Sequence, residues 1–224
     1  MDAAVYAAIA TTPTPTLDRA LGRLSQAADY SRLWIGSSAL LALLAGPAGR
    51  RAAAAGLGSL GLTATVVNVG MKRLGRRRRP DREAVGVPLV RHVPTPGSSS
   101  FPSGHSAAAF AFATGVGHTL PQAGVPLRGL AALVAYSRVH TGVHYPGDVL
   151  AGALIGAGIA QAYMSSSSRS VRMIRPAASM SARWENACGK FPSCRRSVGS
   201  YSSESRPTSL RTASKRSKSS LASA

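Results

Sequence analysis

The sequence feature that most constrains the fold is a run without any charged residue from Ala52 to Met71. A helix needs roughly 20 predominantly apolar residues to cross the hydrocarbon core of a bilayer, and this run has that length. Hydrophobic residues make up 45% of the chain but aromatic residues only 5%, so Ala, Leu, Val and Gly carry the apolar content. Small residues let helices approach closely in membrane bundles. The run therefore predicts a spanning helix that packs among similar helices.

Other apolar segments follow the same pattern, although several are shorter than a full membrane span. A soluble, all-helical domain is therefore the alternative. The scarcity of amphipathic faces and Gly/Ala patterns such as Gly152–Gly156 (GALIG) favour a membrane bundle. We predict an all-α, integral-membrane bundle of about five apolar helices in residues 33–164. The expected helices cover residues 33–48, 52–71, 103–120, 127–139 and 149–164.

The two ends of the chain differ from this region. Residues 1–32 have mixed composition, and Leu17–Leu24 is predicted to form a short interfacial helix. The first residues lack the basic start and apolar run of a secretory signal, so insertion is expected to rely on internal helices. Residues 165–224 are rich in Ser and basic residues and have no apolar period. Such a segment cannot bury enough surface to offset its ordering entropy, so we predict a disordered tail.

The net charge of +19 indicates an anionic partner. The basic residues gather in 73–91 and after Arg169, on either side of apolar segments, so a membrane surface fits better than nucleic acid. No basic face interleaved with aromatic residues is present, and we expect no nucleic-acid partner. Cys188 and Cys194 lie in the predicted tail without other metal ligands, so neither a metal site nor a redox compartment follows from them.

Three short segments carry chemistry: Lys72–Pro80 (KRLGRRRRP), Pro102–His105 (PSGH) and Ser137–Asp148 (SRVHTGVHYPGD). Together they supply several cations, a hydroxyl, a glycine, a carboxylate and two well-placed histidines. The three oxygens of a phosphoryl dianion need multiple fixed donors, and Arg and Lys supply them with charge. Imidazoles can act as the nucleophile and as the acid. These segments predict a site that removes phosphate.

The spacing of the segments also resembles a known family. Six residues separate Lys72 from Arg79, five separate Arg138 from His144, and three separate His144 from Asp148. This resembles the complete three-part signature of the type 2 phosphatidic acid phosphatase family, which shares its site with vanadium-dependent haloperoxidases. The resemblance covers residues 33–164. The chain also resembles the phosphatase half of actinobacterial proteins that carry a diacylglycerol-kinase-like domain, but no kinase-like Gly-rich motif follows here.

The resemblance implies a role for each residue of the site. His144 would attack phosphorus and form a phosphohistidine, and Asp148 would orient it. His105 would protonate the leaving oxygen and then deprotonate water. In sequence, only His144 has a carboxylate nearby. Neither a metal nor another cofactor is expected, because side chains supply the positive charge. The phosphate-binding residues implied are Lys72, Arg79, Ser103, Gly104 and Arg138.

The remaining basic and histidine residues receive weaker predictions. Arg76–Arg78 are expected to face solvent or lipid headgroups, because only Arg79 of that run occupies a signature position. His92 and His118 are not expected at the site, and His140 is the one other histidine close enough to His144 to line it.

The leading prediction is an integral-membrane lipid phosphate phosphatase. Its substrate would be phosphatidic acid, a polyprenyl diphosphate or a prenyl-linked sugar phosphate. The alternatives are a vanadate-dependent haloperoxidase, although those proteins are larger and soluble, and a non-catalytic membrane scaffold with a basic tail. We expect a multi-pass protein of the cell membrane with its site on the extracytoplasmic face. The oligomeric state stays open.

Overall fold

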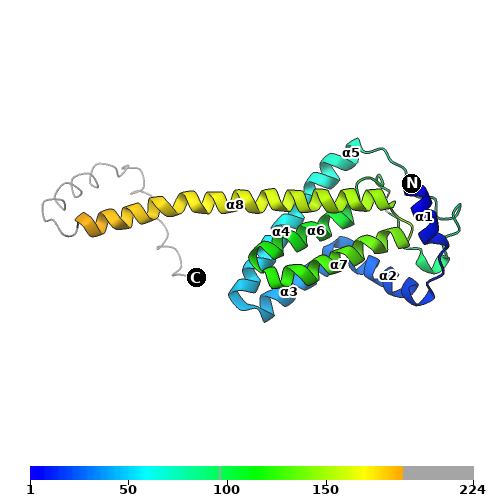
Figure 1. The fold of residues 1–224 in the computed structure, drawn as a ribbon, viewed down its shortest axis with the longest axis horizontal. Coiled ribbons are helices and arrows are strands. Elements are labelled where there is room, and N and C mark those ends of the chain that lie inside the picture. The colour runs from blue at the N-terminus through cyan, green and yellow to red at the C-terminus, as the bar shows by residue number, and fades with distance from the viewer. Residues whose placement is uncertain (96, 189–224) are drawn as a thin grey trace, which may run out of the picture. The chain divides into compact units, whose positions relative to one another are not determined.

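The computed structural model describes residues 1–95 and 97–188, with side-chain environments given as far as Ser168. Within these ranges every regular element is a helix, so the predicted all-α class is confirmed. Residues Met1–Ser168 form one compact unit, and Arg169 begins a second. Figure 1 shows the element order along the chain. The elements are α1 Asp2–Thr11, α2 Pro15–Ala27, η1 Asp29–Ser31, α3 Arg32–Leu44, α4 Gly46–Thr65, η2 Val66–Met71, α5 Lys72–Leu74, η3 Leu89–Arg91, α6 Gly104–Thr119, α7 Pro121–His140 and α8 Pro146–Cys188.

Helix α6 lies at the centre of the bundle and contacts α4 on one side and α7 on another. Glycines permit the close approach that these contacts need. A Cβ at Gly56 of α4 would lie 2.6 Å from Val116, and one at Gly156 of α8 would lie 2.0 Å from the Ala107 carbonyl oxygen. Gly152 approaches Ser103 in the same way. The segment Gly152–Gly156 (GALIG) is thus the part of α8 that packs on the start of α6.

The helix predicted for residues 52–71 is longer than expected. It begins at Gly46 and continues through α4, the π-helical turn η2 and α5 to Leu74. Gly46 and Pro47 were expected to end the preceding helix. Pro47 in fact lies in the first turn of this helix, where proline is well tolerated. The helix expected at 127–139 is also longer, since α7 begins at Pro121 and includes Pro126. A proline this close to the start removes few helical hydrogen bonds.

Among the residues that the structure describes, two helices are long and apolar enough to cross a membrane by length and composition. They are Gly46–Leu74, with 29 residues, and Pro146–Ser168, with 23. Both leave large apolar side chains exposed, including Leu62 and Val69 on the first and Leu154 on the second. Such exposed apolar faces suit contact with lipid. The other expected spans, α3, α6 and α7, fall short of this test.

The last helix extends past its predicted end at Met164. The hydroxyl groups of Ser166 and Ser168 donate to the carbonyl oxygens of Tyr163 and Met164, at 2.8 and 2.7 Å. Serines that bond back to the helix in this way need not end it. Residues 165–188, predicted to be disordered, are therefore helical in α8. Residues 189–224, the rest of the predicted tail with Cys194, lie outside the described residues.

The helix predicted near Leu17–Leu24 is α2, and it packs on α7 through a buried polar cluster. Asp18 accepts a hydrogen bond from Nε of Arg91 at 2.8 Å and lies 3.0 Å from Nε2 of His140. Arg91 also donates to carbonyl oxygens at the end of α1. The Asp18 carboxylate and the carbonyl oxygens together satisfy the buried Arg91 guanidinium, and Arg91 in turn neutralises Asp18. His140 therefore belongs to this cluster and does not line the phosphoryl site.

Candidate active site

The three signature segments meet at one end of the bundle. Lys72 ends the long helix, Ser103 caps α6 and Asp148 lies in the first turn of α8. Arg138 ends α7, and His144 follows in the loop before α8. The loop between α5 and α6 brings Arg79 to the same place, 3.2 Å from His144. The fold thus gathers every residue that the signature implied.

His144 is buried beside Asp148, but a serine lies between the two side chains. Nδ1 of His144 is 3.8 Å from Oδ2 of Asp148, beyond ordinary hydrogen-bond length. The Ser100 hydroxyl donates to that same carboxylate oxygen and lies 3.4 Å from Nδ1. Asp148 also accepts the Tyr145 N–H at 3.0 Å. Asp148 is therefore fixed by several donors, and Ser100 is a site residue that sequence analysis did not identify.

The other ring nitrogen of His144 faces the cations. Nε2 lies 3.2 Å from Nη1 of Arg79, which also donates to the Val143 carbonyl oxygen at 2.9 Å. The pKa of His144 is lowered to about 4, chiefly by burial; Arg79 and Arg138 act in the same direction and Asp148 opposes them. The ring is therefore neutral at physiological pH. Because an arginine can only donate, Nε2 carries the lone pair.

His105 has a carboxylate partner, contrary to the sequence analysis. Nε2 of His105 lies 2.8 Å from Oδ1 of Asp29, which comes from η1 after α2. The same oxygen is 3.6 Å from Nη1 of Arg138. Asp29 is 76 residues away from His105, so no local pattern signals the contact. Asp29 thus joins two signature residues.

The charge state of His105 depends on its surroundings. Its pKa is lowered to about 3, chiefly by burial and also by the charges of Arg138, His144, Lys72 and Arg79. Asp29 is the carboxylate in contact with the ring. A phosphoryl dianion next to His105 would add negative charge and so favour the protonated form.

Three of the implied phosphate-binding residues lie at the first turn of α6: Ser103 is its N-cap, Gly104 begins it, and Lys72 reaches it from the long helix. Nζ of Lys72 lies 3.4 Å from the Ser98 hydroxyl. A Cβ at Gly104 would be 3.3 Å from Nζ of Lys72, so a side chain there would crowd the amine. The Ser103 hydroxyl accepts bonds from the backbone and the hydroxyl of Ser106. Its own proton is left to donate, next to the free N–H groups of a helix start, which attract anions.

Arg138 contributes a further donor. Its Nη1 donates to the Ser25 hydroxyl at 2.6 Å, while Nε is buried with no hydrogen-bond partner among the described residues. An unpaired donor on a buried guanidinium is costly unless a ligand satisfies it. Arg138 therefore fits the phosphate-binding role that the signature implies.

Arg77 corrects the expectation that Arg76–Arg78 all face solvent or headgroups. Its two terminal nitrogens bind Asp148 at 2.9 Å and Asp2 at 2.6 Å, and the guanidinium stacks on the Tyr145 ring. Asp2 in turn accepts the Gly147 N–H at the start of α8. Arg77 thus ties the first helix to the carboxylate behind His144.

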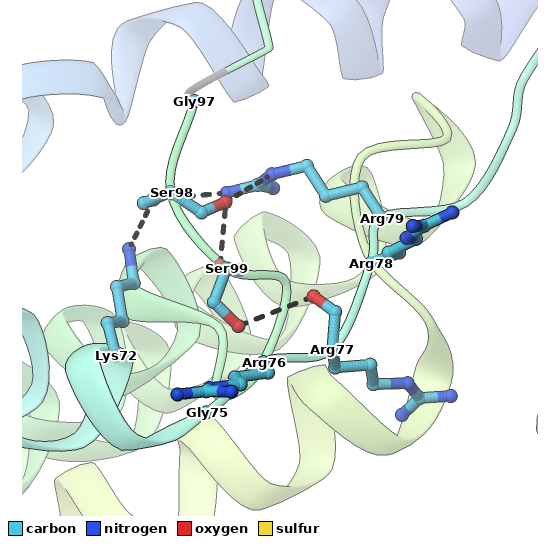
Figure 2. A pocket seen from close by; sticks show the side chains of 9 residues that line it. All are labelled: Lys72, Gly75, Arg76, Arg77, Arg78, Arg79, Gly97, Ser98 and Ser99. Carbon is cyan, nitrogen blue, oxygen red and sulfur yellow. Dashed lines mark hydrogen bonds between the residues drawn. The ribbon is translucent and has the colours of Figure 1, made fainter.

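An open cavity of about 490 Å³ adjoins this site. Figure 2 shows its lining, with Lys72 and Arg79 both pointing toward Ser98. Within residues 1–95 and 97–188, no group of three or more His, Cys, Asp or Glu side chains is placed to hold a metal ion. The expectation that no metal takes part stays a prediction. The cavity is lined by Lys72, Gly75, Arg76, Arg77, Arg78, Arg79, Gly97, Ser98 and Ser99.

Comparison with known proteins agrees with this geometry. The chain is 41% identical over 124 residues to the decaprenylphosphoryl-5-phosphoribose phosphatase of Mycobacterium tuberculosis, covering 53% of this chain and 63% of that protein. The chain thus spans less than two thirds of that relative. The crystal structure of Aquifex aeolicus LpxE superposes with a TM-score of 0.58 at 25% identity, covering 73% of this chain and 94% of the other.

A second solved structure shares the fold. The transmembrane PAP2-type phosphatidylglycerolphosphate phosphatase of Bacillus subtilis superposes with a TM-score of 0.53 at 24% identity, covering 74% of this chain and 85% of the other. The predicted helical bundle is confirmed by these neighbours, and two of its described helices have the length and composition to cross a membrane. The sequence model of the PAP2 superfamily matches residues 52–172, more than half of the chain. The protein therefore belongs to the PAP2 superfamily.

Proposed function

We propose that the protein is a membrane phosphatase that hydrolyses a lipid phosphomonoester or diphosphate through a phosphohistidine intermediate. The observation that carries the proposal is the buried, neutral His144, whose Nε2 faces Arg79 while Nδ1 faces Ser100 and Asp148. A fixed imidazole with its lone pair directed at a cationic cage is a nucleophile prepared for phosphorus. The name of the mycobacterial relative, a phosphatase of a lipid-linked phosphoribose, supports the same reaction class.

In the first step the phosphoryl oxygens are held by Lys72, Arg79 and Arg138, and by donors at the start of α6. Nε2 of His144 attacks phosphorus, and the bond between phosphorus and the leaving oxygen breaks. His105 gives its proton to that oxygen, so a neutral alcohol or a protonated phosphate departs. Cations fixed around the phosphoryl group gain strength as charge moves to its oxygens.

In the second step water attacks the phosphohistidine. His105, now neutral, takes a proton from that water, and the bond between phosphorus and Nε2 breaks to release phosphate. The positive charge that His144 carries while phosphorylated is stabilised by Asp148, which Ser100 and Arg77 hold in place.

Asp29 gives His105 the support that Asp148 gives His144. Because its carboxylate contacts Nε2 of His105, the remaining nitrogen, Nδ1, is the one that serves the leaving oxygen. The carboxylate also favours the protonated ring that the first step needs. Each histidine would thus have its own acidic partner.

The orientation in the membrane follows from the two ends of the long helix. Arg50 and Arg51 lie near its start and Lys72 near its end. We infer an extracytoplasmic site, because positive residues favour the cytoplasmic side and Arg50 and Arg51 would then lie there. The basic run that begins at Lys72 argues for the opposite orientation, but phosphate binding accounts for part of that run. With Cys188 and Cys194 replaced by Ser, an impermeant thiol reagent should label Glu83→Cys and not Arg51→Cys in intact cells; the reverse pattern would contradict this orientation.

The function is tested by phosphate release from a panel of lipid phosphates, with purified protein in detergent. His144→Ala should be inactive on every substrate, and the matched control His118→Ala should match wild type, because His118 is an exposed residue that pairs with Gln161. Wild-type turnover should persist in EDTA and be inhibited by orthovanadate, which mimics pentacoordinate phosphorus. Absence of turnover on the whole panel, or loss in EDTA that Mg²⁺ restores, would refute the proposal.

A further inference from the structure

The basic cavity beside the phosphoryl site contains more positive charge than one phosphate uses. Its volume of about 490 Å³ lies within the roughly 300–1,000 Å³ of small-molecule sites. Gly75 closes one side, where an added Cβ would lie 2.7 Å from the Phe101 carbonyl oxygen. The serines Ser98 and Ser99 form another side. The cavity is thus built by close backbone contact between two segments of the α5–α6 loop.

Lys72 and Arg79 belong both to this cavity and to the phosphoryl site. Nη1 of Arg79 is 3.2 Å from His144, while its Nε and Nη2 donate to Ser98. Nζ of Lys72 contacts the Ser98 hydroxyl and lies next to Gly104 of the α6 start. The two cations therefore stand between the reacting phosphorus and the cavity. A group in the cavity would be a direct neighbour of the group being hydrolysed.

Arg76 and Arg78 are the two cations of this cavity that the other described residues leave without a hydrogen bond or ion pair. Arg77 is bound by Asp2 and Asp148, and Arg79 by backbone oxygens. Arg76 makes no hydrogen bond or ion pair with any described residue, and it is exposed. In Figure 2 its guanidinium lies on the Lys72 side of the loop, whereas the Arg78 side chain points away from Ser98 and Ser99. A free guanidinium offers a planar fork that binds phosphate through two hydrogen bonds.

We propose that Arg76, with Lys72 and Ser98, forms a second anion site that binds the phosphate group that is not hydrolysed. This inference rests on the proposed function and narrows its substrate to a lipid with two phosphate groups close together. A prenyl diphosphate and a prenyl phosphoryl sugar phosphate both offer this chemistry, whereas phosphatidic acid has one phosphate. The name of the mycobacterial relative describes a substrate with a phosphoryl and a phosphoribose group.

The position of the cavity suits such a lipid. Lys72 ends the membrane helix Gly46–Leu74, so the cavity lies at the level where headgroups meet hydrocarbon. Val69 and Leu74 are exposed on the same helix end. An apolar chain can therefore follow this helix while its two phosphates occupy the two adjoining sites.

The test compares a prenyl diphosphate with the prenyl monophosphate of the same chain length, and adds a prenyl phosphoryl sugar phosphate as a third arm. Arg76→Ala should lower kcat/KM roughly tenfold for the two-phosphate lipids, as expected for loss of a charge-assisted hydrogen bond. The monophosphate rate should be unchanged. The matched control Arg73→Ala removes the same charge from an exposed residue outside the cavity and should change neither rate. The third arm shows which two-phosphate lipid the site prefers.

Binding of inorganic ions to the same detergent-purified proteins gives an independent measurement. Calorimetry should show that wild type binds pyrophosphate more tightly than orthophosphate, and that Arg76→Ala removes this advantage while Arg76→Lys keeps part of it. The advantage should weaken with added salt because Arg76 is exposed.

The outcomes separate the inference from the function. If Arg76→Ala changes monophosphate and diphosphate rates equally, or changes neither, the second anion site is wrong while the phosphatase stands. If wild type releases phosphate from none of the lipids, the proposed function is wrong. The pyrophosphate measurement then still decides the anion site, because loss of the pyrophosphate advantage in Arg76→Ala supports it and an unchanged advantage overturns it.

Discussion

Replacing Asp29 with Asn tests whether a residue far from the signature takes part in the reaction. The change keeps the size of the side chain and removes the negative charge that contacts Nε2 of His105 at 2.8 Å. We expect the acid step to slow, since the neutral amide neither favours the protonated ring nor fixes its tautomer.

Two considerations limit the size of the rate loss in Asp29→Asn. Loss of the acid itself is worth about 10²–10⁴-fold, and a residue that acts through His105 cannot exceed that limit. The side chains of His105 and Asp29 are 22% and 29% exposed, so water can partly replace the carboxylate. Because a partly exposed charge pair contributes about 1 kcal/mol at most, we expect roughly a 5-fold loss in kcat on lipid substrates.

The assay uses Asp29→Asn, His105→Ala and the double variant on a lipid phosphate and on an aryl phosphate. An aryl oxide leaves with little need of a proton, so both single losses should shrink on that substrate. In the double variant the Asp29 change should have no further effect, because residues that act as a unit are not additive. Glu83→Gln, an exposed carboxylate in the loop, is the matched control and should match wild type.

Asp29 also lies 3.6 Å from Arg138, which gives a competing explanation. If the carboxylate served mainly to position Arg138 for phosphate binding, KM would rise on both substrates and the loss would persist without His105. That pattern, or wild-type rates in Asp29→Asn, would refute the role in acid catalysis. His144→Ala retaining aryl phosphatase activity while His105→Ala does not would reverse the assignment of the two histidines.

Three further predictions concern protonation, packing and the chain end. Because the pKa of His144 is lowered to about 4, its neutral, attacking form persists at pH values well below 6.5. The kcat/KM for an aryl phosphate should therefore stay constant as the pH falls through 6.5, and a decrease centred near pH 6.5 would contradict this. Gly156→Ala places a methyl group against the Ala107 carbonyl and should lower stability by about 1–3 kcal/mol, whereas Gly158→Ala, which meets nothing within 4 Å, should not; thermal unfolding in detergent decides. Truncation after Ser168, the end of the first compact unit, should leave folding and phosphate release intact, and an insoluble product would show that the removed part is needed.

The residues that sequence analysis identified share one property, which is a short spacing within a segment. Lys72 with Arg79, and His144 with Asp148, lie in motifs whose order and intervals are visible in one chain. The helices were also predictable, because long uncharged runs and prolines mark them. Their ends were not, since a helix can begin at Pro121 or continue through Ser165–Ser168 when its hydrogen bonds are still satisfied.

The residues that it missed are joined across the chain. Asp29 meets His105, and Asp2 meets Arg77, over separations of 76 and 75 residues. A single sequence holds no information on such pairs. One signal was nevertheless present: the chain has 8 acidic residues against 27 basic ones. With acids so scarce, each carboxylate ahead of the membrane helices was a candidate partner for a buried cation.

The N-terminal segment therefore contacts the candidate site as well as the rest of the bundle. The matched family region begins at residue 52, yet three carboxylates before it each bind a group at the site end of the bundle. Asp2 holds Arg77, Asp29 holds His105, and Asp18 fixes α2 to α7 through Arg91 and His140. Because Asp29 follows α2 directly, the Asp18 cluster determines where that carboxylate can lie. A change at Asp18 should thus alter His105 without touching it, which makes residues 1–32 the first place to look for the differences in rate and specificity that the signature residues do not explain.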